Sequence, residues 1–145
     1  MGQVTTQSIL LPMLGLMLLT FAVWVYMYML RIGHIRRQRI HPQKLTTPDN
    51  LAGLIPEPIS YPAYNFRNLL ELPILFYALC LLLYVTGMAD AWDLLAAWVF
   101  VVLRVVHSVI HCTVNIVIYR FYIYFASALV LWVMLFRVVL RIAWS

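Results

Sequence analysis

Three residues that could bind a charged ligand lie together near the start of an apolar stretch. Arg67 and Glu71 are four residues apart, which places them on one face of a helix, and Asn68 lies beside them. A guanidinium binds anionic oxygens, a carboxylate binds an ammonium, and an amide can both donate and accept hydrogen bonds. The spacing therefore predicts a small site for a ligand that carries charges of both signs.

A second polar set follows one stripe of a later apolar stretch. Arg104 is followed at helical spacing by His107, Ser108, His111 and Asn115. At about 100° per residue these positions share one side of a helix, and the remaining positions are almost all aliphatic or aromatic. A polar stripe on an otherwise apolar helix faces a bundle interior or a cavity rather than lipid.

Positive charge dominates the polar residues inside and at the edges of the apolar stretches. The set consists of Arg31, Arg67, Asn68, Glu71, Arg104, His107, His111 and Arg120. One carboxylate among several arginines suits a ligand with several negative groups and one ammonium, and glutathione has this form. An arginine near its sulfur would favour the thiolate, which is the nucleophile in transfer to an electrophile. A lipophilic electrophile would reach such a site from the bilayer.

Two other interpretations of these residues stay open. Arg67 and Glu71 could satisfy each other, and the polar stripe could join helices by hydrogen bonds. A small bundle rarely needs so many charges for that purpose, because each is costly to bury. His107 and His111 could also bind a metal or haem, but two ligands do not make a site and the arginines would repel a cation. We therefore expect no metal.

The composition identifies the medium that surrounds these residues. Of 145 residues, 65% are hydrophobic and 10% are charged, whereas a soluble domain has about 45–50% apolar and about 25% charged residues. So few charges cannot cover a soluble surface, and the chain is too apolar to be disordered. We therefore expect an integral membrane protein, in which a net charge of +5 sets the orientation and does not indicate nucleic acid binding.

Four apolar stretches are long enough to cross a bilayer core about 30 Å thick. They predict one membrane domain over residues 1–145, an all-α bundle with transmembrane helices at about 8–31, 64–88, 93–117 and 120–143. The basic segment 32–62 holds most of the prolines, which predicts a loop, and the excess of arginine places it in the cytoplasm. Pro73 predicts a kink in the second helix, or a place where a neighbour or a ligand pairs with the freed carbonyl. Asn115 and Arg120 interrupt the last apolar run and predict a turn there.

The sequence resembles the MAPEG family, the membrane-associated proteins in eicosanoid and glutathione metabolism. The similarity covers nearly the whole chain, with four spans and a long basic first connection. Its most specific parts are Arg67-Asn68-Leu69-Leu70-Glu71 with Pro73, and Arg104-x-x-His107-Ser108-x-x-His111 followed by Arg120. The first part resembles an Arg-Asn-x-x-Glu run whose members bind glutathione. The second resembles the Arg-x-x-His-Thr/Ser stretch of the prostaglandin E synthase branch.

The resemblance implies a glutathione-dependent membrane transferase or peroxidase that forms a homotrimer with sites between subunits. Arg120 stands where the arginine that stabilises the thiolate is expected, and Glu71 would face the ammonium of glutathione. The residues that would bind glutathione or line its pocket are Arg31, Arg67, Asn68, Glu71, Arg104, His107 and His111.

The sequence departs from the family pattern at two places. His111 stands where eicosanoid branches often carry tyrosine, and residues 121–124 are strongly aromatic. We therefore expect a bacterial-type member in the inner membrane, with a substrate other than an eicosanoid, and another thiol could replace glutathione. Two non-catalytic alternatives stay open: a protein that presents lipids to a partner enzyme, and a structural subunit of a membrane complex. The retained glutathione-binding set favours the enzyme.

Overall fold

The computed structural model describes residues 6–144. Residues 1–5 and 145, which the single-domain prediction includes, lie outside the described residues. The described chain is helical and contains no strand. In chain order its elements are η1 (Thr6–Ile9), α1 (Leu10–Arg37), η2 (Pro42–Leu45), α2 (Pro48–Leu54), α3 (Glu57–Leu69), α4 (Leu72–Thr86), α5 (Ala91–Cys112) and α6 (Val117–Ala143).

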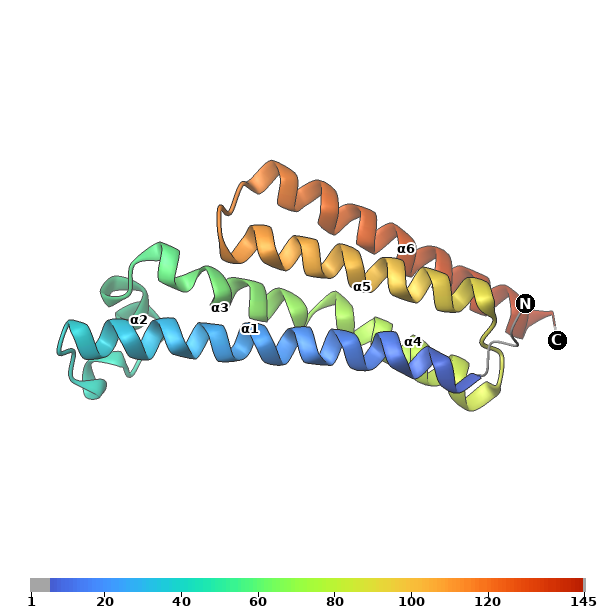
Figure 1. Ribbon diagram of the computed structural model, residues 1–145, viewed down its shortest axis with the longest axis horizontal. Coiled ribbons are helices and arrows are strands. Elements are labelled where there is room, and N and C mark those ends of the chain that lie inside the picture. Colours follow the sequence, from blue (N-terminus) through green and yellow to red (C-terminus); the bar gives the residue numbers. More distant parts are fainter. Residues whose placement is uncertain (1–5, 145) are drawn as a thin grey trace.

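Four helical segments within residues 6–144 are long and apolar enough to cross a membrane. They are Thr6–Arg37, Glu57–Thr86, Ala91–Cys112 and Val117–Ala143, so that α3 and α4 together form the second span. The four segments lie side by side in one bundle (Figure 1). The chain is therefore an all-α integral membrane protein with four spanning helices, as the sequence predicts.

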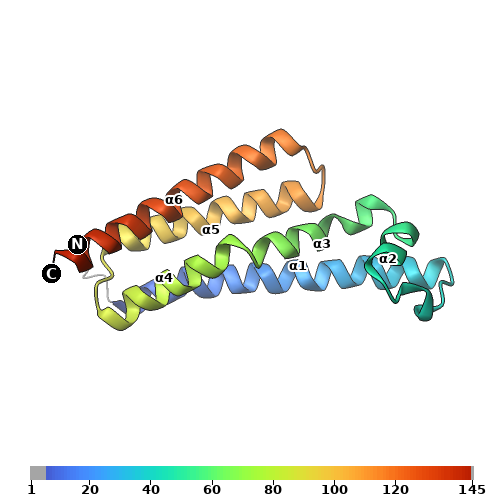
Figure 2. The same cartoon turned by 180° about the vertical axis from the view of Figure 1, so that it is seen from behind.

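The two ends of the bundle differ in what they carry. Both ends of the described chain lie at one end with the connection between α4 and α5, and residues 38–56 lie at the opposite end (Figures 1 and 2). The turn between α5 and α6 lies toward the end that carries residues 38–56, although α1 and α3 extend beyond it. We call this end the basic end, after Arg36, Arg37, Arg39 and Lys44.

The connection between the first two spans is shorter and more helical than the loop expected at 32–62. α1 continues to Arg37 and α3 begins at Glu57, so residues 38–56 join them, and these include η2 and α2. Excluding helix at the prolines was wrong for Pro58, which lies in the first turn of α3, and for the buried Pro62 inside it. Proline is tolerated in a first turn because its missing N–H would have no partner there.

The second span is interrupted around Glu71. α3 ends at Leu69 and α4 begins at Leu72, with Pro73 in the first turn of α4. Pro73 has no N–H to donate to the carbonyl four residues earlier, and Glu71 has non-helical angles of φ −97° and ψ −100°. The kink predicted at Pro73 is thus confirmed as a full break, which leaves Glu71 between two helices.

The turn between the last two spans comprises residues 113–116. α5 ends at Cys112 and α6 begins at Val117, so both helix boundaries lie earlier than the expected positions near 117 and 120. Asn115 has a positive φ of 49°, and its backbone N–H donates to the Ile110 carbonyl at 2.8 Å. Asparagine is one of the few residues that adopts this left-handed conformation readily. Arg120 lies inside α6 rather than in the turn.

An apolar core joins the spans along their length. Among its fully buried side chains, Phe76 of α4 and Phe100 of α5 stack with ring centroids 4.5 Å apart. Leu16 of α1 and Met134 of α6 belong to the same buried cluster. Because all four spans contribute to this core, it fixes their relative positions and hence the polar side chains on their inner faces.

An ionic cluster fastens the start of α5 to the end of α6. Asp90 and Asp93 form a capping box at the N-terminus of α5. Arg137 lies 2.5 Å from the carboxylates of both aspartates, and Arg141 pairs with Asp90 and lies 3.0 Å from Asp93. Arg137 also lies over the Trp92 ring, 4.7 Å from its centroid. Arg137 and Arg141 thus lie at the end of the bundle opposite the basic end, and each of them is paired with both aspartates.

The pH dependence of this cluster gives a first prediction. The pKa of the Asp90 carboxyl lies well below its ordinary value of 3.8, chiefly because Arg137 donates hydrogen bonds to the charged form. Such a carboxyl stabilises the fold above its unfolded pKa and loses that contribution as the pH falls toward its folded value. The gap in thermal midpoint between wild type and Asp90→Asn should therefore stay constant from about pH 8 to about pH 5 and narrow below about pH 4. Thermal unfolding in detergent measures this difference in midpoint. A difference that narrows only at higher pH would show that the charge of Asp90 is not its source.

Candidate active site

A polar cleft of about 220 Å³ lies between α3, α5 and α6, near the α5–α6 turn. It is lined by Asn68, His107, His111, Val117, Arg120, Phe121 and Tyr124. Residues far apart in the sequence meet here because α5 and α6 are antiparallel and α3 packs against α5. Asn68, His107, His111 and Arg120, which the sequence predicts as site residues, are thus brought together.

Arg104 lies directly behind the cleft and is completely buried. Its Nη2 donates to the Asn68 side-chain oxygen at 2.5 Å and to the Asn68 carbonyl at 3.2 Å. Its guanidinium carbon lies 5.3 Å from the centroid of the Tyr124 ring. Its Nε and Nη1 are buried and have no hydrogen-bond partner among the described residues. A buried charge with unpaired N–H groups is costly, so an anion that reached it would be bound favourably.

The two histidines form the wall of the cleft on α5. His107 and His111 are both buried, and their rings meet edge to face with centroids 5.4 Å apart. The His107 ring also lies 5.9 Å from that of Tyr124. The Nδ1 atoms of both histidines are buried without a partner among the described residues. Within residues 6–144, no group of three His, Cys, Asp or Glu side chains is placed to hold a metal.

Arg120 supplies the positive charge on the α6 side of the cleft. It lies one turn into the helix, and its Nη1 donates to the side-chain oxygen of Asn115 in the preceding turn. The side chain is half-buried, so it is screened from water less than a surface arginine would be. A negative group in the cleft would be stabilised both by this guanidinium and by the positive end of α6.

A buried polar contact behind the site fixes α3 against α5. Asn65 is completely buried, and its side-chain oxygen accepts a hydrogen bond from the Ser108 hydroxyl at 3.3 Å. Its amide nitrogen lies 3.5 Å from the Cys112 sulfur. The Ser108 of the predicted polar stripe therefore positions the helices and does not line the cleft.

Besides Arg104, which lies behind the cleft, three of the predicted site residues lie outside it. Arg67 and Glu71 are exposed, and the structure shows no ion pair between them in the part of the chain it describes. The expectation that they share one helical face is wrong, because the break after Leu69 separates them. Glu71 instead accepts a hydrogen bond from the Asn68 amide at 3.3 Å. Arg31 is half-buried on α1, and its buried Nε has no partner among residues 6–144.

The cleft also contains residues that the sequence reasoning did not place there. Tyr124 lies one turn after Arg120, so the helical period of α6 could have identified it. Val117 and Phe121 form the apolar part of the lining on the same helix. The contact between Asn115 and Arg120 depends on the conformation of the turn, which no spacing rule predicts.

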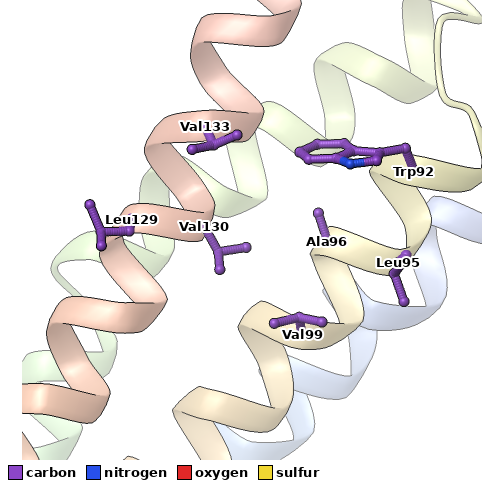
Figure 3. A pocket seen from close by; sticks show the side chains of 7 residues that line it. All are labelled: Trp92, Leu95, Ala96, Val99, Leu129, Val130 and Val133. Atoms are coloured by element: carbon purple, nitrogen blue, oxygen red, sulfur yellow. The ribbon is translucent and has the colours of Figure 1, made fainter.

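A larger groove of about 330 Å³ lies between α5 and α6 nearer the other end of the bundle. Figure 3 shows its lining, in which side chains from the two helices face each other: Trp92, Leu95, Ala96, Val99, Leu129, Val130 and Val133. Apart from the indole nitrogen of Trp92, these side chains carry no polar atom. The groove therefore has no group that could activate a thiol, and the smaller polar cleft is the candidate active site.

The four spanning helices form a membrane helix bundle with a polar cleft, which has two buried histidines in its wall and a buried arginine behind it. The model of the MAPEG family matches residues 9–140, which include every residue of the cleft, and the chain belongs to this family. Members of the family use glutathione, and they include glutathione transferases and peroxidases. No curated protein and no solved structure matches the chain.

Proposed function

We propose that the protein is a glutathione transferase or peroxidase that activates the glutathione thiol for attack on a lipophilic electrophile or a lipid hydroperoxide. The observation that carries the proposal is a group of buried nitrogen atoms at the cleft, on Arg104, His107 and His111, that have no hydrogen-bond partner among residues 6–144. Buried polar atoms are nearly always hydrogen-bonded, so unpaired ones at a cleft indicate a ligand that pairs with them. Membership of the MAPEG family supports glutathione as that ligand.

The residues of the cleft divide the task between binding and activation. Asn68, Arg104 and His107 would bind the polar backbone of glutathione, and His111 would line the same pocket. Arg120 would lie near the sulfur, where its charge favours the thiolate over the thiol. The thiolate then forms a bond to the electrophilic carbon while the leaving group departs, or to the distal oxygen of a hydroperoxide while the O–O bond breaks.

The exposed charges of the second span support assembly with further copies of the chain. Arg67 and Glu71 are exposed within a segment that spans the membrane, where an unpaired charge near the bilayer centre costs about 2.5–3.5 kcal/mol. In a homotrimer with sites between subunits, Arg67, Glu71 and Arg31 would complete the cleft of a neighbour, with Glu71 facing the glutathione ammonium. Native mass spectrometry of the purified protein should give three chains, and a monomer that retains full activity would contradict this assembly.

The orientation follows from the distribution of charge. The basic end carries Arg36, Arg37, Arg39 and Lys44, and the excess of such residues favours the cytoplasmic side. The α5–α6 turn lies toward that end (Figure 1), and the candidate active site is lined by residues on both sides of this turn. In the inner membrane of a bacterium, a water-soluble thiol would then reach the cleft from the cytoplasm, and a lipophilic electrophile would reach it from the bilayer.

A direct test uses the purified protein in lipid nanodiscs. Glutathione is supplied with a lipophilic aryl halide in one assay and with a fatty acid hydroperoxide in another. We expect turnover that requires glutathione in at least one assay. Absence of turnover in both, with retained binding of fatty acids, would instead support a non-catalytic lipid-binding protein.

A further inference from the structure

We propose that Asn115 is a positioning residue that holds the guanidinium of Arg120 over the cleft. This inference rests on the proposed function of Arg120. The side-chain oxygen of Asn115 accepts a hydrogen bond from Nη1 of Arg120, which is itself in the cleft lining. No other hydrogen bond from the Arg120 side chain is seen within residues 6–144. Asn115 is thus the anchor that the structure provides for this charge.

The anchor matters because an arginine side chain is long and flexible. Ordering such a side chain costs conformational entropy, and a guanidinium that samples several positions stabilises a thiolate less. The bond to Asn115 uses one N–H of Nη1 and leaves the N–H groups of Nη2 and Nε for a ligand. A neutral amide oxygen also leaves the full charge of Arg120 available, which a carboxylate at the same place would not.

The choice of asparagine combines two requirements at one position. Its φ of 49° excludes most side chains without strain, and its N–H closes the end of α5 on the Ile110 carbonyl. Glycine would meet the requirement of the backbone but has no side chain to hold Arg120. Aspartate would hold Arg120 but would neutralise it. These two substitutions therefore separate the role of the turn from the role of the amide.

The test follows the ultraviolet absorbance of the glutathione thiolate and the turnover of each variant as a function of pH. In Asn115→Gly we expect the midpoint of thiolate formation to move upward by about one pH unit and kcat at neutral pH to fall about 10-fold, with the KM for glutathione nearly unchanged. In Asn115→Asp we expect a similar loss of thiolate. The matched control is Thr113→Ala, which removes a hydroxyl from the same turn that bonds only to the Val109 carbonyl and should keep the wild-type profile.

The outcomes distinguish this inference from the proposed function. A wild-type pH profile in Asn115→Gly, together with loss of the thiolate in Arg120→Ala, would overturn the role of Asn115 and leave the function standing. Absence of any thiolate signal in the wild type would overturn both. If Asn115→Gly does not fold, Asn115→Asp decides the question. It keeps the acceptor oxygen but places a negative charge against the guanidinium of Arg120. A wild-type midpoint of thiolate formation in Asn115→Asp would show that the two side chains are not in contact, and it would contradict the proposal.

Discussion

Replacing Arg120 with alanine is expected to lower glutathione-dependent turnover by about 100- to 1,000-fold, the loss typical when one preorganised donor to a developing negative charge is removed. Arg120 is the arginine in the lining of the cleft, and Arg104 behind it already donates to Asn68. No other cation among the described lining residues can take its place near a thiolate. The measurement is kcat with saturating glutathione, combined with the thiolate absorbance at neutral pH.

Two further variants control this experiment. Arg120→Lys keeps the charge but lacks the planar donor group that reaches Asn115, so we expect partial activity and a weaker thiolate signal. Arg37→Ala removes an exposed arginine at the end of α1 that is not part of the cleft lining, and it should behave as the wild type. If Arg120→Ala turned over at the wild-type rate, Arg120 would have no role in activating the thiol.

Replacing Asp93 with alanine is expected to produce the largest loss of stability, about 3 kcal/mol. The carboxylate of Asp93 is completely buried and pairs with both Arg137 and Arg141. Removing it leaves two arginines without their buried partner and also breaks the capping box with Asp90. This loss of stability is at the lower end of the range for breaking a buried ion pair, because the side chains of Arg137 and Arg141 remain 30% and 26% exposed.

The measurement is unfolding of the purified protein in detergent, by heat or by a denaturant. Asp49→Ala is the matched control, because Asp49 is exposed in α2 and has no ion pair in the described part of the chain. The glutathione affinity of the folded fraction should be unaffected in Asp93→Ala, since the ionic cluster joins the start of α5 to the end of α6, whereas the cleft lies at the α5–α6 turn. A change in midpoint no larger than that of Asp49→Ala would show that the cluster contributes little.

The sequence predicts the four spans and most of the cleft because the spans depend on the length of apolar runs and the cleft residues depend on helical spacing. Long apolar runs identify spanning helices, and the spacing of Arg104, His107 and His111 places them on one side of α5. A polar stripe in an apolar helix must face protein, and these three side chains are indeed buried. This part of the site needs no knowledge of the other helices.

The errors arise where the backbone departs from a regular helix. The prolines of the first connection predict a loop, but the first turn of α3 tolerates Pro58, and the helix also continues through Pro62. The break after Leu69 separates Arg67 from Glu71, which a continuous helix would have placed on one face. Likewise, the pairing of Arg137 with Asp90 and Asp93 depends on where α5 turns into α6, and the sequence contains no glycine or proline to mark that turn.

The proposed function requires that the cleft binds glutathione and lowers the pKa of its thiol. The most direct test is an ultraviolet difference titration of the folded, detergent-purified protein with glutathione near neutral pH. We expect a thiolate absorbance that rises with glutathione and saturates at one thiolate for each occupied site. A folded protein that gives no thiolate signal at any glutathione concentration would contradict it.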